Sequence, residues 1–203
     1  MNVSDLRQHS GACARNRQPI LEVLRRVLPE NVRVLEIGSG TGEHGAFFAS
    51  EQPSWSWQPS DLSPAALEST GAWVEYMGLS NLAMPVALDV TASTWPVEQA
   101  DALFCANMIH ISPWACTLGL LDGASRVLAA GGRLVTYGPY KMGGVHTAPS
   151  NASFDQSLRF RDPSWGLRDF EEITVAAGTR GLVHSETQPM PANNFCLVFE
   201  REA

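Results

Sequence analysis

The sequence predicts one α/β domain over residues 1–203, built on a doubly wound sheet of seven strands. Short apolar runs alternate with amphipathic stretches over most of the chain, which is typical of a mostly parallel sheet covered by helices. A glycine-rich turn follows the first apolar run, where such sheets bind ligands. Two strand-like segments near the carboxyl terminus leave no room for a helix between them, so they predict an antiparallel hairpin.

Composition limits the class of protein. The 203 residues are 44% hydrophobic and 17% charged, which is ordinary for a globular domain. A net charge of −7 disfavours a nucleic-acid partner, because phosphate backbones are also negative. The four cysteines form no CxxC pair, so we expect neither a metal site nor a disulfide framework. Residues 1–17 lack the apolar run of a secretory signal, and no stretch could span a bilayer, so we expect a cytoplasmic location.

Apolar periodicity predicts the elements of the first half of the chain. Apolar residues recur at helical spacing from Pro19, and Ser63 before Pro64 is typical of a helix start. The elements predicted here are helices over 19–28, 43–50 and 64–77, and strands over 32–37 and 54–59.

The second half continues the alternation and then changes character. A helix over 116–128 stops before Gly131 and Gly132, where glycine commonly ends a helix. Residues 140–170 are polar and contain two prolines, and we expect them to lie above the sheet as an insertion that covers a substrate. The strands predicted here are 85–88, 101–106 and 133–137, followed by the hairpin of 182–187 and 195–200.

The glycine turn and two acidic residues at strand ends predict a ligand site. Glycines at 38, 40 and 42 allow a tight turn and close approach of the backbone to a ligand. Asp61 ends the second strand, where a carboxylate can accept both hydroxyls of a ribose. Asp89 ends the third strand, within reach of an adenine edge. A purely structural glycine turn is the alternative, and the three strand ends together favour the ligand.

A dinucleotide site is a second alternative, because hydride-transferring dehydrogenases also use a glycine turn. Their fingerprint is Gly-x-Gly-x-x-Gly, whereas this chain has Gly-x-Gly-x-Gly with Glu43 at the position of the third glycine. A carboxylate there repels a pyrophosphate but tolerates a cationic sulfonium ligand. The spacing therefore favours the sulfonium ligand.

The motifs VLEIGSGTGEHGAFFA, QPSDLS and ALDVT resemble class I S-adenosylmethionine-dependent methyltransferases, which have a Rossmann-like fold. RNRQPIL, NMIHISPW, GGRLVTYGPYK and SNASFDQSLRFRDPSWGLRD narrow the resemblance to an uncharacterised domain family that includes methyltransferase-like protein 26. The resemblance implies S-adenosylmethionine as cofactor. The residues that it implies at the cofactor are Arg15, Asn16, Glu36, Gly38, Ser39, Gly40, Gly42, His44, Asp61, Leu62, Asp89, Val90, Asn107, Met108 and Ile109.

Candidate catalytic groups follow the fourth and fifth strands. His110 is the leading candidate for a general base or a substrate contact, since its unperturbed pKa lies near neutrality. Its alternative is a packed histidine bonded to a loop carbonyl. Tyr137 and Tyr140 are candidates to line the acceptor pocket, with ordinary burial as their alternative.

The insertion supplies candidate substrate residues. Its mixture of charges and aromatic rings suits a polar pocket, and Trp114 follows the His110 loop as a possible wall. The alternative is a surface helix with Phe154, Leu158 and Trp165 packed beneath it, in which Asp155 pairs with Arg159. The candidates are Trp114, Asn151, Phe154, Asp155, Arg159 and Trp165.

We therefore expect a methyltransferase that acts on a small-molecule acceptor, without nucleic-acid or membrane partners. Methyl transfer needs the nucleophile and the methyl group held in line in a dry site. A module that binds the cofactor without turnover is the main alternative, and a nicotinamide-dependent dehydrogenase is the weaker one.

Overall fold

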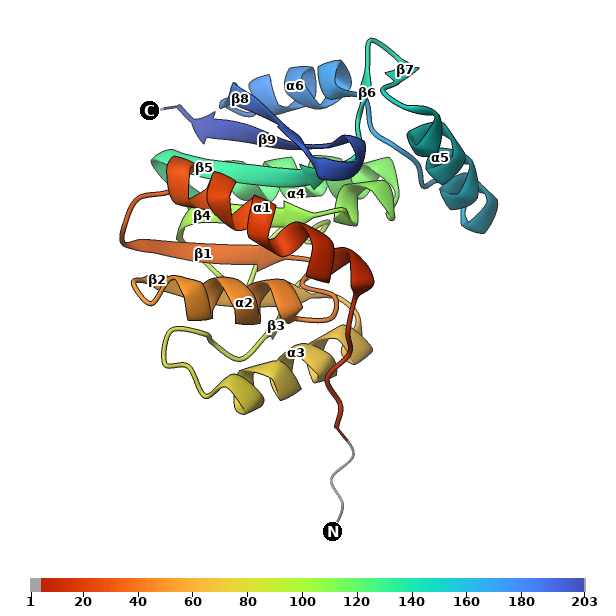
Figure 1. Ribbon diagram of the computed structural model, residues 1–203. Coiled ribbons are helices and arrows are strands. Elements are labelled where there is room, and N and C mark those ends of the chain that lie inside the picture. The colour runs from red at the N-terminus through yellow and green to blue at the C-terminus, as the bar shows by residue number, and fades with distance from the viewer. Residues whose placement is uncertain (1–4, 203) are drawn as a thin grey trace.

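Seven strands form one sheet through the centre of the molecule, with helices on both faces (Figure 1). The computed structural model describes residues 5–202. The strand order β3-β2-β1-β4-β5-β9-β8 confirms the predicted fold class. The elements are α1 (Gly11–Val27), β1 (Val32–Ile37), α2 (Glu43–Glu51), β2 (Trp55–Asp61), α3 (Pro64–Met77), β3 (Val86–Ala87), β4 (Ala100–Ala106), η1 (Met108–His110), α4 (Trp114–Val127), β5 (Leu128–Gly138), β6 (Lys141–Met142), β7 (Val145–His146), α5 (Pro149–Arg161), α6 (Phe170–Gly178), β8 (Leu182–Met190), η2 (Pro191–Asn193) and β9 (Asn194–Arg201).

Strand pairing follows the predicted division between a parallel part and an antiparallel end. The pairs β1–β2, β1–β4, β2–β3 and β4–β5 are parallel. β9 runs antiparallel to both β5 and β8, which confirms the predicted hairpin. β6 and β7 form a separate small hairpin outside the main sheet.

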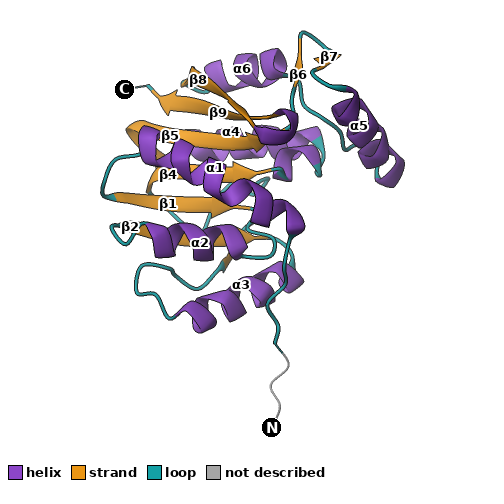
Figure 2. Cartoon of the chain, in the orientation of Figure 1, coloured by secondary structure: helices purple, strands orange, loops and turns teal. Residues whose placement is uncertain are grey.

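Each face of the sheet buries its own apolar core, since successive side chains of a strand point to opposite faces. Val34 of β1 belongs to the core that includes α1 and α2. Leu35 and Ile37 belong to the core that includes α4 and α6. Figure 2 shows the strands as one layer between these two groups of helices.

The topology fixes where a ligand site can form. The chain leaves β1 towards β2 on one side and later returns to β4 on the other, so the turn after β1 lies at the switch point of the sheet. In Figure 1 the beginning of α1, the β6–β7 hairpin and α5 all lie at the edge of the sheet where β1 and β4 end. Segments that are far apart in the sequence therefore border the same edge.

The first helix begins earlier than predicted, at Gly11 instead of Pro19. The residues before Pro19 lack an apolar stripe, so the spacing of apolar residues does not predict a helix there. Tertiary contacts stabilise this part, because the Ser10 side chain caps the helix and Asn16 is buried. Pro19, where the predicted helix starts, lies inside α1.

Two further elements differ from the sequence prediction. β3 contains only Val86 and Ala87 instead of residues 85–88, since its pairing with β2 covers two positions. The insertion, for which no strands were predicted, contains a short hairpin and a helix, α5. Within residues 5–202, no helix combines the length and apolar character needed to cross a bilayer.

Candidate functional site

The turn between β1 and α2 contains three glycines in the left-handed region. φ is +71° at Gly38, +56° at Gly40 and +85° at Gly42, values that side chains disfavour. A Cβ on Gly42 would lie 2.7 Å from Thr70 Cα, so α3 packs directly against the turn. A Cβ on Gly40 would meet no atom within 4 Å. The turn is closed against α3 at one glycine and open at another, which lets a ligand approach its backbone.

Asp61, the last residue of β2, holds this turn through its carboxylate. Oδ2 accepts the Gly40 N–H at 2.9 Å, and Oδ1 accepts the Ser63 N–H at 2.9 Å. A carboxylate has about four lone-pair positions, so each oxygen keeps one for another donor. The half-buried carboxylate can therefore accept two neighbouring hydroxyls beside the open Gly40.

The main chain after β3 brings a second acidic residue to the same rim. The Leu88 N–H donates to the Asp61 carbonyl oxygen at 3.0 Å, which places Asp89 next to the end of β2. The Thr91 hydroxyl and N–H donate to Asp89 Oδ1 at 2.7 and 2.8 Å and lower the pKa of Asp89. Asp89 is exposed and keeps Oδ2 for a ligand. The predicted neighbours of these acids are the exposed Leu62 and the buried Val90.

Glu36 lies below the turn as a buried carboxyl group, 1% exposed. Trp57 Nε1–H donates to Glu36 Oε2 at 2.9 Å. Burial raises the pKa of Glu36 to about 8, and the bond from Trp57 only partly offsets this. A Cβ on Gly45 would lie 2.9 Å from Oε2, so α2 approaches the group closely. Near pH 7 most of this carboxyl is protonated.

α1 brings Asn16 against the first turn of α2. His44 Nε2 lies 2.8 Å from Asn16 Oδ1, and because Oδ1 only accepts, Nε2 carries the proton. Burial lowers the pKa of His44 to about 4, so this imidazole is neutral near pH 7. The Asn16 side chain also partly offsets the raised pKa of Tyr137. Arg15, one position earlier, is exposed.

The end of β4 lies against the glycine turn. A Cβ on Gly38 would lie 3.0 Å from Met108 Cβ, so these two segments touch. Asn107 has φ +62°, an uncommon conformation outside glycine that tends to occur at functional sites. Its N–H donates to the Tyr137 carbonyl oxygen at 2.8 Å, while Ile109 is buried. Met108 is therefore the member of this predicted group that contacts the turn.

His110 has no exposed surface. The Arg168 N–H donates to His110 Nδ1 at 3.3 Å, so the proton is on Nε2. Nε2 has no partner within residues 5–202, and a Cβ on Gly138 would collide with it. Burial, with a smaller effect of the Arg168 guanidinium, lowers the pKa of His110 to about 3. The ring is neutral near pH 7 and holds an unused hydrogen-bond donor.

The two candidate tyrosines are also buried. Tyr140 has no exposed surface, and its hydroxyl donates to Thr136 Oγ1 at 2.8 Å. Burial raises the pKa of Tyr140 well above its usual range. The Tyr140 ring contacts His110 edge to face at 4.9 Å between centroids. Tyr137 is 4% exposed, and burial raises its pKa too. Both phenols are neutral.

Asp155 connects α5 to the loop that follows it. It accepts the Leu167 N–H at 2.7 Å, lies 3.0 Å from His146 Nε2, and pairs with Arg159 at 3.3 Å, as predicted for an i, i+4 pair. Burial raises the pKa of Asp155, but these partners outweigh it and the net pKa is lowered. The carboxylate therefore links α5 to β7 and to the loop after α5, all within the insertion.

Of the other candidates in the insertion, Asn151 bonds a residue outside it, whereas Phe154 is exposed. Asn151 Nδ2 donates to Thr147 Oγ1 at 3.0 Å and to the Asn193 carbonyl oxygen at 2.9 Å, which joins α5 to the β8–β9 connection. Phe154 is 40% exposed, so it does not pack beneath the helix as the surface-helix alternative expected, because it precedes the inward-facing Asp155. Trp165 is half-buried.

Trp114 lines a groove between α4 and α6 of about 680 Å³, with the Arg168 guanidinium 5.7 Å from its ring centroid. Two other hollows, of about 630 and 370 Å³, lie beside Arg133 and beside Pro19. The glycine turn and the strand-end acids line none of these three. The candidate site is thus defined by the rim that the glycine turn and the two strand-end acids form.

The structure brings the glycine turn, Asp61, Asp89 and Met108 together. Glu36 and Ile109 are buried, and so are the predicted catalytic residues His110, Tyr137 and Tyr140. Sequence reasoning missed the contacts of Trp57 with Glu36 and of Arg168 with His110. It also missed Gly138, whose lack of a side chain makes room for the His110 ring. These partners are distant in sequence, so no local spacing could have indicated them.

Comparison with solved structures supports the fold. An O-methyltransferase family protein from Burkholderia thailandensis matches with a TM-score of 0.81 at 16% identity, over 95% of this chain and 58% of that chain. The S-adenosylmethionine-dependent methyltransferase SibL matches with a TM-score of 0.78 at 18% identity, over 95% and 56%. PigF, solved with SAH, matches with a TM-score of 0.77 at 17% identity, over 92% and 56%.

At these identities the matches show the class I methyltransferase fold, and this chain spans little more than half the length of those proteins. A family model covers nearly the whole chain. It matches residues 7–201 and is described as a protein of unknown function (DUF938). The chain therefore belongs to the DUF938 family.

Proposed function

We propose that this protein is an S-adenosylmethionine-dependent methyltransferase with a small-molecule acceptor. The observation that carries the proposal is the open space at Gly40 beside Asp61, whose two carboxylate oxygens each keep a lone pair. This pair lies at the switch point of a sheet shared with proteins described as methyltransferases. The net charge of −7 favours a small acceptor over a nucleic acid.

The residues on the rim fit the parts of this cofactor. The glycine turn and Ser39 would hold the methionine and ribose portion, and Asp61 would accept the ribose hydroxyls. The free Oδ2 of Asp89 suits the amino group of adenine, with Val90 and Leu62 as apolar neighbours. Arg15 is exposed at the edge where α1 begins and would pair with the methionine carboxylate.

The cofactor, when bound, supplies a methyl group on a cationic sulfur. The protein must hold the acceptor in line with that methyl group and exclude water. We place His110 at the acceptor, where its Nε2–H would donate to the nucleophile's second lone pair and orient it. A base role for His110 needs the other tautomer, which the Arg168 N–H disfavours. Tyr137 and Tyr140 would form the floor of this pocket.

The insertion of residues 140–170 is proposed to cover the acceptor. α5 and the β6–β7 hairpin lie at the edge where the candidate site forms (Figure 1). Asp155 and Asn151 hold the insertion in place, which leaves Phe154, Trp165 and the outer part of Arg159 for contact with the acceptor. Trp114 would form the opposite wall.

Calorimetric titration with S-adenosylmethionine and S-adenosylhomocysteine tests the cofactor. The wild type should bind both, and Asp61→Asn should weaken binding by about tenfold or more, because a charged acceptor of two hydroxyls is lost. Asp122→Asn is the matched control, since Asp122 lies on α4 and pairs with Arg180. Folded wild-type protein that binds neither compound would overturn the proposal.

A module that binds the cofactor without turnover is the second candidate, favoured by the full burial of His110 and Tyr140. Incubation with labelled S-adenosylmethionine and a metabolite extract, followed by mass spectrometry, separates the two. A labelled product that disappears in Asp61→Asn supports the methyltransferase. Cofactor binding with no labelled product supports the module.

A further inference from the structure

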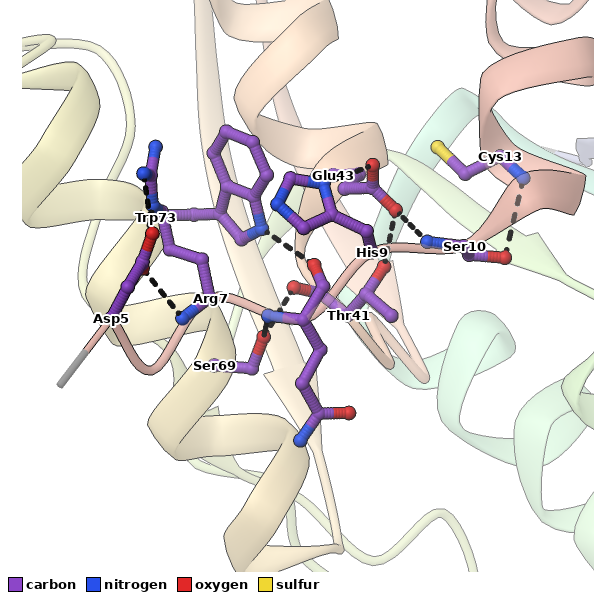
Figure 3. Close-up of polar contacts among 10 residues, drawn as sticks. Asp5, Arg7, His9, Ser10, Cys13, Thr41, Glu43, Ser69 and Trp73 are labelled. Atoms are coloured by element: carbon purple, nitrogen blue, oxygen red, sulfur yellow. Dashed lines mark hydrogen bonds and ion pairs between the residues drawn. The ribbon is translucent and has the colours of Figure 1, made fainter.

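Residues 5–10 form a strap that runs along α3 before α1 begins (Figure 3). The Gln8 N–H donates to Ser69 Oγ at 2.8 Å, and Trp73 Nε1–H donates to the Gln8 carbonyl oxygen at 3.1 Å. The Arg7 guanidinium lies 3.5 Å from the ring centroid of Tyr76. The strap is therefore fixed to α3 by its backbone and by a cation–π contact.

At its other end the strap meets Glu43, the first residue of α2. The Glu43 carboxylate is 7% exposed and accepts the Ser10 N–H. It also accepts the Thr41 hydroxyl at 3.2 Å and lies 3.3 Å from His9 Nδ1. Figure 3 shows these partners converging from the strap and from the glycine turn. One nearly buried carboxylate thus joins the two segments.

Thr41 extends this connection to α3. Its carbonyl oxygen accepts the Ser69 hydroxyl at 2.8 Å, while its own hydroxyl donates to Glu43. Ser69 also receives the strap through Gln8. Thr41, inside the glycine turn, is therefore bonded to both Glu43 and Ser69, and each of these two residues also bonds the strap. Neither Glu43 nor the strap contacts the acids that would bind the nucleoside, Asp61 and Asp89.

We propose that Glu43 is a positioning residue that couples docking of the strap to cofactor binding in the glycine turn. The inference rests on the proposed function. Glu43 and Ser69 each bond the strap and Thr41 at the same time. A cofactor that needs the ordered turn therefore stabilises the docked strap, and the docked strap strengthens cofactor binding. Ser10 also caps α1, so Glu43 sets the start of the helix that carries Asn16 to His44.

Hydrogen exchange on the full chain, with and without saturating S-adenosylhomocysteine, tests this coupling. In the wild type the ligand should slow exchange in residues 7–14 as well as in residues 38–42. Glu43→Ala should bind the ligand about tenfold more weakly, and the ligand should no longer slow exchange in the strap. Glu43→Gln should restore part of both effects, because its amide oxygen can still accept. Glu22→Ala, at an exposed glutamate of α1, should match the wild type.

Trp73→Phe provides a second variant, since it removes the bond to Gln8 without touching the turn. Weaker ligand binding in this variant supports the coupling. Binding equal to the wild type in both Glu43→Ala and Trp73→Phe overturns it. A wild type that binds no ligand overturns the proposed function and the coupling with it. In that case the role of Glu43 in holding the strap is tested by hydrogen exchange without ligand. Glu43→Ala should then speed exchange in residues 7–10 and 38–42.

Discussion

Glu36 and Asp61 are carboxyl groups on neighbouring strands with opposite environments. Asp61 is half-buried at the rim and bonded to two backbone N–H groups. Glu36 is almost completely buried, and its carboxyl group accepts one hydrogen bond, from Trp57. Burial disfavours the charged form of Glu36, and the nearby Asp61 charge adds to this effect. Asp61 is thus suited to bind a ligand, whereas Glu36 affects stability.

The raised pKa of Glu36 predicts a pH dependence of folding. Between its unfolded pKa, 4.5, and about 8 the folded protein keeps a proton that the unfolded chain has lost. Stability therefore falls as pH rises through this window, with a slope of at most about 1.4 kcal/mol per pH unit. Glu36→Gln should remove this loss, so the variant gains stability relative to the wild type from pH 5 to 8.

Denaturant unfolding at several pH values measures the effect of Glu36. Glu75→Gln, at an exposed position of α3, is the matched control and should follow the wild type. A constant difference between Glu36→Gln and wild type over pH 5 to 8 would contradict the prediction.

At the scale of elements, α3 packs against the glycine turn at Gly42, whereas the space beside Gly40 is unoccupied. Gly42→Ala should lower the free energy of unfolding by about 1–3 kcal/mol, because of its left-handed φ and the clash with Thr70. Gly40→Ala should cost only about 1 kcal/mol, from its φ alone. Its added methyl group should nevertheless weaken S-adenosylhomocysteine binding. Denaturant unfolding measures the stability of Gly42→Ala and Gly40→Ala, and calorimetry measures their ligand binding. Equal losses of stability in the two variants would contradict the packing described.

Asp155 holds α5 to β7 and to the loop that follows α5. Asp155→Ala removes partners of Leu167, His146 and Arg159 together and should speed hydrogen exchange at the Leu167 amide. Gln156→Ala, at the next and exposed position of α5, should leave that amide unchanged. If the Leu167 amide exchanges equally in both variants, Asp155 does not hold the insertion. Because α5 borders the candidate site, its release should also lower any methyl transfer.

At the scale of the whole molecule, we propose that residues 1–203 unfold as one domain, since one sheet runs through both apolar cores. Calorimetry should show one cooperative transition. S-adenosylhomocysteine at 100 times its Kd should add about 2.7 kcal/mol and raise the midpoint by roughly 5–10 °C. Two separate transitions, or a midpoint that the ligand leaves unchanged, would contradict this prediction.

The sequence by itself determined the fold class and the rim of the candidate site. Strand burial, helix periodicity and glycine in a tight turn are local properties, and the parallel topology then places residues that follow each strand at one edge. Asp61 and Asp89 were predicted in this way, and the structure places them side by side through Leu88.

Only the tertiary structure decided the environment of each group. Its type and position make His110 a candidate base or substrate contact, with a packed histidine as the alternative. Its burial, its tautomer and the room made by Gly138 depend on residues about 30 to 60 positions away. The same holds for the strap, where Glu43 joins residues 9 and 10 to the glycine turn. Desolvation and hydrogen bonding depend on three-dimensional neighbours, and the spacing of residues along a chain does not contain that information.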